Sequence, residues 1–83
     1  MEYNGWKNYA TWNVTLWVAN EEYLYQVARD YVRLCRVFGD LVTWDNFLDY
    51  AGLKGGRTGD DVLWHDAKVS RMECRRFLQE LVD

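Results

Sequence analysis

The sequence predicts a mainly α-helical fold: a small, compact bundle of about four short helices, with a glycine-rich loop before the last helix. Three observations lead to this prediction. Apolar residues recur at steps of three and four along several segments, which places them on one face of a helix. The 83 residues contain no proline, which is the strongest helix breaker. Residues that cap helices precede the apolar segments. We expect a single domain over residues 1–83.

The first expected helix has a competing interpretation. Residues 11–18 alternate in the manner of a β-strand and are rich in β-branched and aromatic side chains. No second segment of similar length is available to pair with them, since residues 62–64 are too few, and an isolated strand leaves its backbone groups unpaired. We therefore expect a helix over residues 12–19, capped by Thr11. The alternative is an α+β fold with a short strand at 11–18.

The second expected helix has the clearest pattern and runs from about Glu21 to Phe38. Asn20 is a favourable N-cap, and the acidic residues after it lie where the helix dipole favours negative charge. Gly39 is expected to end the helix. The opposite face carries Arg29, Arg33 and Arg36. The predicted buried stripe consists of Leu24, Val27, Ala28, Tyr31, Leu34, Cys35 and Phe38.

Two shorter helices are expected to complete the bundle. Thr43 is placed to cap the third, and Gly52 to end it. The last helix begins at Ser70, because Ser70 and Glu73 have the spacing of a capping box, in which each side chain bonds the other residue's free backbone N–H. Between these helices, residues 54–61 hold three of the 6 glycines and predict a loop.

The aromatic content points to a binding function. The chain has 5 Trp, 6 Tyr and 3 Phe, which are hard to bury completely in so small a domain. At least one or two tryptophans are expected to stay partly exposed, and tryptophan, tyrosine and arginine are the residues that anchor protein interfaces. A self-associated dimer would also cover such side chains and stays open. The candidate partner-binding residues are Trp17, Tyr25, Arg29, Arg33, Arg36 and Trp64.

Residues for catalysis are sparse. His65 is the one histidine, and it forms no zinc spacing with Cys35 and Cys74, which we expect to be buried thiols. No phosphate-binding glycine motif is present. We expect neither an enzyme nor a metal or cofactor. No apolar stretch is long enough for a membrane span, and the N-terminus does not resemble a signal peptide, so we expect a cytoplasmic protein.

Residues 8–21 carry a recognisable run, N-Y-x-T-W-N-V-x-L-W-x-x-N-[DE]. It resembles the opening of small uncharacterised proteins found in bacteriophages, plasmids and other mobile elements. The likeness covers residues 5–25 and implies no particular activity. In physical terms the run predicts a structural role, with Thr11 capping a helix, Trp12 and Leu16 packing, and Tyr9 and Asn13 satisfying backbone groups at the turn. The alternative is that the run forms a binding surface.

Small size, aromatic excess and this resemblance together favour a non-catalytic phage or mobile-element protein. We expect it to bind and inhibit a host protein, such as a CRISPR effector, a restriction enzyme or another defence nuclease. The alternative is a small nucleic-acid-associated regulator that uses the stripe of Arg29, Arg33 and Arg36. The net charge of −3 argues against that alternative, because nucleic-acid binders carry a basic excess.

Overall fold

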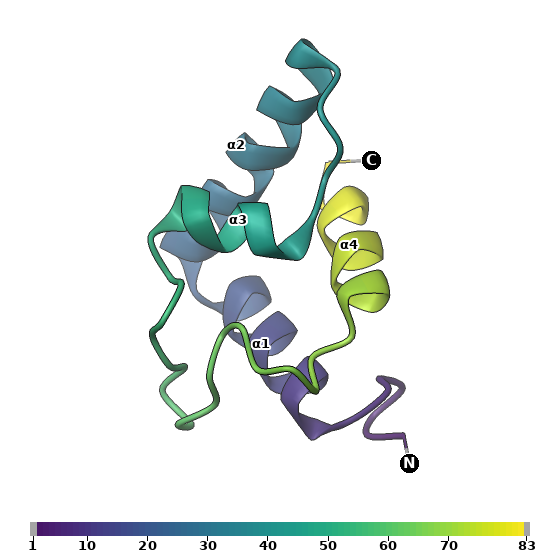
Figure 1. Ribbon diagram of the computed structural model, residues 1–83, viewed down its shortest axis with the longest axis vertical. Helices are drawn as coiled ribbons and strands as arrows, with labels where there is room; N and C mark the ends of the chain where they lie inside the picture. The colour runs from purple at the N-terminus through teal and green to yellow at the C-terminus, as the bar shows by residue number, and fades with distance from the viewer. Residues whose placement is uncertain (1, 83) are drawn as a thin grey trace.

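The computed structural model describes residues 2–82, which form four helices connected by short loops and one long loop. They are α1 (Tyr9–Asn20), α2 (Glu22–Phe38), α3 (Trp44–Ala51) and α4 (Arg71–Glu80). Helix α2 packs against the other three, and α4 also contacts α1 and α3 (Figure 1). The predicted mainly α fold is confirmed. The alternative strand at 11–18 is wrong, because those residues lie inside α1.

Two predicted helix starts are wrong by one to three residues. Helix α1 begins earlier than expected because Asn8 is its cap: the Oδ1 atom of Asn8 accepts a hydrogen bond from the backbone N–H of Thr11 at 2.9 Å. Thr11 is therefore a helical residue and not the cap. At the next junction, Asn20 ends α1, and Glu21 occupies the N-cap position of α2 without a side-chain cap bond. Because α1 continues to Asn20, that residue cannot also cap α2.

The other caps follow the sequence. Gly39 and Gly52 end α2 and α3 with φ of 71° and 72°, a left-handed conformation that favours glycine. Thr43 caps α3 by accepting a hydrogen bond from the backbone N–H of Asn46 at 3.1 Å. These residues settle where α2 stops and α3 starts.

Only one half of the predicted capping box at α4 forms. The Oγ atom of Ser70 accepts a hydrogen bond from the N–H of Glu73 at 3.2 Å, as expected. The Glu73 carboxylate instead accepts from the backbone N–H of Lys7 at 2.8 Å, and the N–H of Ser70 donates to the hydroxyl of Thr11 at 2.9 Å. Contacts with the N-terminal segment and α1 thus replace the local return bond.

The hydrophobic core lies where the four helices meet. Trp44, Phe47 and Leu48 of α3 are fully buried, and the indole N–H of Trp44 donates to the carbonyl of Trp64 at 2.9 Å. Cys35 and Cys74 are buried free thiols, as predicted, and burial raises the pKa of Cys74 well above its usual value. The remaining core residues are Val14, Val18, Leu24, Ala28, Tyr31, Val32, Val42, Trp64, Val69 and Leu78.

The predicted buried stripe of α2 is wrong at two positions. Leu34 and Phe38 are exposed, by 42% and 72%, whereas Val32, outside the predicted stripe, is completely buried. Helix α2 packs against α1, α3 and α4, so its buried face is wider than a single stripe and includes Val32.

The long loop between α3 and α4 is held against α1 by polar side chains of the N-terminal run. The amide nitrogen of Asn8 donates to the carbonyl of Lys68 at 2.7 Å. Five residues further on, the amide of Asn13 accepts from the hydroxyl of Thr58 at 2.6 Å and donates to the carboxylate of Asp60 at 2.8 Å. The indole N–H of Trp17 donates to the same carboxylate oxygen at 3.0 Å. Asn8, Asn13 and Trp17 therefore hold the long loop in place against α1.

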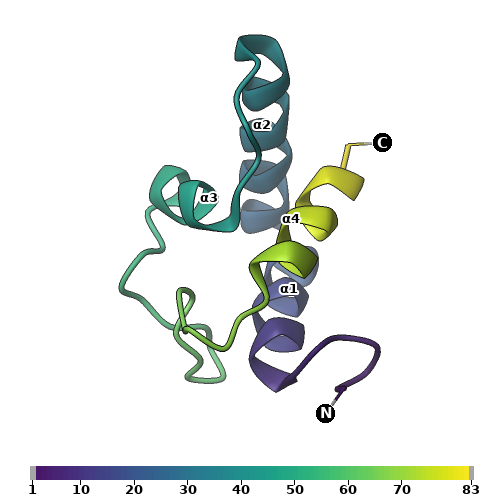
Figure 2. The ribbon, with the colours of Figure 1, turned by 45° about the vertical axis from the view of Figure 1, so that its right-hand side comes forward.

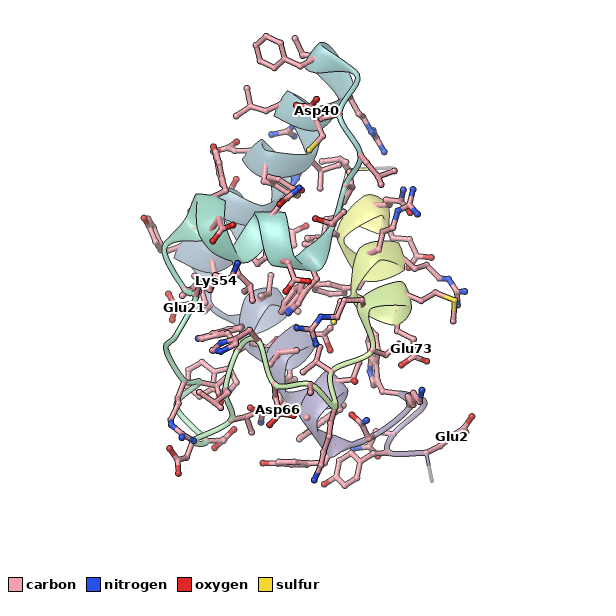
Figure 3. The ribbon with its side chains drawn as sticks, viewed as in Figure 1. Glu2, Glu21, Asp40, Lys54, Asp66 and Glu73 are labelled. Atoms are coloured by element: carbon pink, nitrogen blue, oxygen red, sulfur yellow. The ribbon has the colours of Figure 1, made fainter. Side chains whose placement is uncertain are left out.

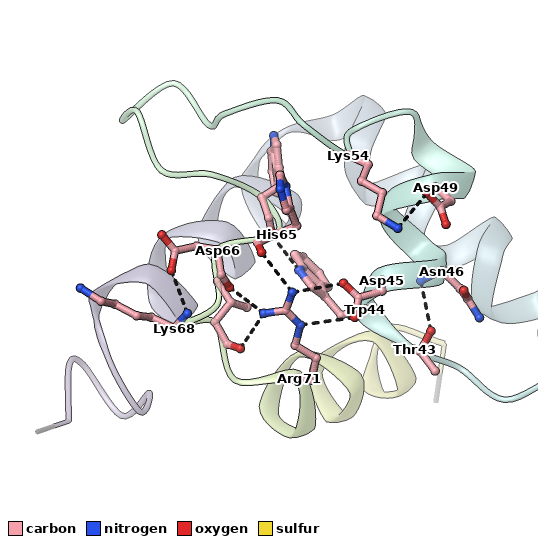
Figure 4. Close-up of polar contacts among 12 residues, drawn as sticks. Thr43, Trp44, Asp45, Asn46, Asp49, Lys54, His65, Asp66, Lys68 and Arg71 are labelled. Carbon is pink, nitrogen blue, oxygen red and sulfur yellow. Dashed lines mark hydrogen bonds and ion pairs between the residues drawn. The ribbon is translucent and has the colours of Figure 1, made fainter.

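Arg71 fixes the other end of the loop (Figure 4). Its guanidinium contacts both carboxylate oxygens of Asp45 on α3, at 3.2 and 3.4 Å. It also donates to the backbone carbonyls of His65, Asp66 and Val69 at 3.1, 2.6 and 3.0 Å. A single side chain thus ties α4 to α3 and to the loop between them.

Candidate partner-binding site

The C-terminal end of α2 extends beyond the other helices (Figures 1 and 2). Helix α2 has 17 residues and is about 25 Å long at 1.5 Å per residue, whereas α3 and α4 have 8 and 10 residues. The last turns of α2 are consequently only partly covered: Cys35 is buried and Arg36 contacts the carbonyl of Gln79 on α4. Four apolar side chains stay in solvent here, and we call them the α2 tip: Leu34 (42% exposed), Val37 (75%), Phe38 (72%) and Leu41 (62%).

A surface groove of about 570 Å³ adjoins the α2 tip at Leu41. It lies between α2, the connection that follows it, and α3. One wall is made by Tyr31 and Tyr50, whose rings lie 5.6 Å apart between centroids. The hydroxyl of Tyr31 donates to the carbonyl of Thr43 at 3.2 Å, and burial raises the pKa of Tyr31. The residues that line the groove are Tyr31, Cys35, Asp40, Leu41, Thr43, Asn46 and Tyr50.

Charged residues are few among those that line the groove, although Arg33 and Arg36 lie on the last turns of α2 beside the α2 tip. Asp40, labelled near this end of the molecule in Figure 3, is the one charged residue that lines the groove. On α2, Arg33 lies 3.7 Å from the carboxylate of Asp30, in an exposed ion pair that contributes little free energy. Bulky apolar side chains next to an aromatic-lined groove are the usual make-up of the centre of a protein interface.

The three predicted arginines of α2 have different environments. Arg29 is half-buried, its guanidinium lies 5.7 Å from the ring centroid of Tyr25, and its Nε atom is buried without a hydrogen-bond partner. Arg33 faces Asp30. Arg36 reaches toward the end of α4, with 3.5 Å contacts to the carbonyls of Gln79 and Val82. They do not form one uniform basic row.

Of the predicted partner-binding tryptophans, Trp64 is contradicted. It is 3% exposed, because it packs against Trp44 with a centroid separation of 6.3 Å and belongs to the core. Trp17 is half-buried and lies far along the chain from the α2 tip. The expectation that one or two tryptophans stay partly exposed is confirmed, since Trp6, Trp12 and Trp17 are all half-buried.

None of the residues of the α2 tip is among the predicted partner-binding residues. Leu34 and Phe38 continue the apolar periodicity of α2, so they looked like core residues. A signal was available: the predicted third helix was far shorter than the second, so it could not cover the second along its whole length. Val37 and Phe38 are adjacent, so their side chains lie on different faces of the last turn. A single neighbouring helix cannot bury both, and at least one stays exposed unless a partner covers it.

In the part of the chain that the structure describes, no cluster of three or more histidine, cysteine or acidic residues is placed to hold a metal ion. The Nδ1 atom of His65 accepts a hydrogen bond from the backbone N–H of Gly55 at 3.3 Å, so this histidine helps to shape the loop. Among residues 2–82, no helix has both the length and the apolar character for crossing a bilayer.

Comparison with known proteins identifies a family and no activity. No curated protein and no solved structure matches the chain. A family model described as "Family of unknown function (DUF7249)" matches residues 1–83. With its whole length covered, the chain belongs to the family of unknown function DUF7249.

Proposed function

We propose that this protein acts by binding another protein through the α2 tip and its groove, without catalysing a reaction. The observation that carries the proposal is the exposure of Val37 and Phe38, by 75% and 72%, at the free end of a well-packed helix. Burying side chains of this size contributes about 1.5–3 kcal/mol each. Their exposure therefore leaves free energy that association with a partner can recover.

The partner in this proposal is a host protein, and binding blocks its activity in the host cytoplasm. The support is the likeness of the N-terminal run to proteins of phages and other mobile elements, together with the small size of the chain. A defence nuclease, such as a CRISPR effector or a restriction enzyme, is the target class that this origin favours.

The alternative, a regulator that binds nucleic acid through Arg29, Arg33 and Arg36, has less support. Phosphate contacts need guanidinium groups that are free to reach a backbone. Arg29 is half-buried with its guanidinium against the ring of Tyr25, and the three arginines do not form one basic row. The carboxylate of Asp40 in the groove would also repel phosphate.

The test is a binding measurement with a matched control. Tagged protein is incubated with host lysate, the retained protein is identified, and its dissociation constant and activity are measured with purified components. The double variant Val37→Ser, Phe38→Ser should weaken binding by about 100-fold or more, the loss expected for two interface anchors. The control Met72→Ser changes a side chain that is 69% exposed on α4 and should bind as the wild type does.

Light scattering on the purified wild type checks the competing explanation of the α2 tip. The proposal predicts a monomer, for the wild type and for the Val37→Ser, Phe38→Ser variant alike. If the wild type is a dimer and the variant a monomer, the tip is covered by a second copy and the proposal fails. Equal affinity of wild type and double variant for the retained protein would also overturn it.

A further inference from the structure

A second concave site lies at the opposite end of α2, where α1 joins α2 and the long loop returns. This α1–α2 pocket has a volume of about 260 Å³ and is lined by Leu16, Trp17, Asn20, Glu21 and Asp60. Pockets for drug-sized ligands span about 300–1,000 Å³, so this one suits a single side chain better than a whole small molecule. Two of these lining side chains hold each other in place, because the indole N–H of Trp17 donates a hydrogen bond to the carboxylate of Asp60 at 3.0 Å.

The pocket carries negative charge that no cation of the described chain neutralises. The Oδ2 atom of Asp60 accepts both hydrogen bonds made by this carboxylate, from Asn13 and from Trp17, so Oδ1 is left for another donor. The carboxylate of Glu21 makes no cap bond. Neither Asp60 nor Glu21 forms an ion pair with a described residue, and no lysine or arginine lines the pocket.

The aromatic wall adds a second reason to expect a cation. The indole of Trp17 lies against Gly59 with ring atoms Cζ2 and Cη2 and donates its N–H to Asp60, so its position is determined on two sides. Tryptophan is the best aromatic partner for an organic cation, and here Trp17 is half-buried while Glu21 and Asp60 are exposed. A carboxylate beside an indole is suited to a planar guanidinium, which can stack on the ring and bond the carboxylate at the same time.

From this geometry we infer that the α1–α2 pocket binds the side chain of an arginine presented by another polypeptide, with the guanidinium against Trp17 and paired with Asp60 and Glu21. A metal ion is a poorer occupant. Calcium and magnesium take six or more oxygen ligands, and the pocket offers two carboxylates, one amide and an indole. The inference does not depend on the α2 tip, which lies at the other end of the same helix.

The probe for the test is a short peptide with blocked ends and one central arginine between glycines, titrated while the indole N–H signal of Trp17 is followed by NMR. We expect saturable shifts at Trp17 with a dissociation constant on the order of 1 mM, a magnitude reasonable for one side chain. The same peptide with citrulline, which has the same shape but no charge, should give no saturable shift. Free arginine amide tests whether the side chain alone is sufficient.

Two charge-matched variants make the test specific. Glu21→Gln with Asp60→Asn removes both pocket carboxylates, keeps their shapes and should weaken peptide binding by about tenfold or more. Glu22→Gln with Asp61→Asn makes the same change in net charge beside the pocket and should leave binding within about twofold of the wild type. The pocket variant retains hydrogen-bond acceptors for Asn13 and Trp17, and its unchanged amide spectrum would confirm that it folds.

Three outcomes would overturn the inference. They are equal binding of the arginine and citrulline peptides, equal weakening in the two double variants, and no saturable shift at Trp17. Because none of these measurements involves Val37 or Phe38, a negative result here leaves the proposed role of the α2 tip standing, and a failure at the tip leaves this pocket standing.

Discussion

The side-chain amide of Asn13 accepts a hydrogen bond from the hydroxyl of Thr58 at 2.6 Å, although the two residues are 45 positions apart in the chain. Asn13 is completely buried and Thr58 is 6% exposed. The Thr58 hydroxyl also accepts from the backbone N–H groups of Asp60 and Val62, at 3.2 and 3.3 Å. This pair connects the middle of α1 to the turn of the long loop, so the N-terminal run has a structural role.

Replacing Thr58 by valine should destabilise the fold by about 1–3 kcal/mol, because the isosteric change leaves the buried carbonyl oxygen of Asn13 without its donor. Urea denaturation followed by tryptophan fluorescence measures the loss. The control Thr58→Ser keeps the hydroxyl and should lose much less. Equal losses in the two variants would show that the methyl group matters and the hydrogen bond does not.

Gly59→Ala should also destabilise the protein, by about 1–3 kcal/mol, as overpacking does elsewhere. A Cβ atom at Gly59 would overlap the indole of Trp17, and the ring cannot move away without losing its bond to Asp60. Thermal unfolding measures the effect. In a Trp17→Leu background the same substitution should cost little, and a cost that does not depend on Trp17 would rule out the overlap as the cause.

Arg71→Lys should lower the free energy of unfolding by about 1–2 kcal/mol although the charge is kept. Lysine cannot reproduce the planar fork that contacts Asp45 and three backbone carbonyls together. Chemical denaturation compares this variant with Arg75→Lys, which changes an exposed arginine on the same helix and should stay within about 0.5 kcal/mol of the wild type. A loss no larger than that control would contradict the role of Arg71.

Asp60 should make stability depend on acidity. Hydrogen bonds from the side chains of Asn13 and Trp17 lower the pKa of Asp60 below its ordinary value of 3.8. A carboxyl group with a lowered pKa in the folded state stabilises the protein above the unfolded pKa and loses this effect as the pH falls through the folded value. The stability advantage of wild type over Asp60→Asn should thus be present at pH 7 and shrink below about pH 4. Denaturation curves across that range test this, and a constant difference would contradict it.

The local part of the fold could be predicted because its signals are local. Gly39 and Gly52 stop their helices through backbone conformation, and Thr43 and Ser70 cap theirs through bonds to residues three positions on. The start of α1 was misjudged because Asn8 and Thr11 are both good caps, and the sequence does not say which one the chain uses. The strand-like alternation of residues 11–18 was misleading, because in the helix Asn13 and Trp17 contact the long loop while Thr15 bonds carbonyls of α1 itself.

The candidate sites were harder to predict because exposure is decided by neighbours. Phe38 and Trp64 are both large apolar residues within apolar patterns, yet one is 72% exposed and the other 3%. The short third helix is a sequence signal for the exposure of Phe38, whereas nothing near Trp64 in the sequence indicates its burial. The course of the long loop places Trp64 against Trp44, and this course depends on how the helices pack.

The sequence by itself determined the helical class, the C-terminal end of α2, both ends of α3, the cap of α4 and the burial of both cysteines. Periodicity, capping and apolar character act over a few residues, so these features could be predicted locally. The tertiary structure alone decided that Asn13 and Trp17 hold the loop at Thr58 and Asp60, and that a pocket forms where α1 meets α2. These features join residues more than 40 positions apart, and such contacts depend on the packing of whole helices.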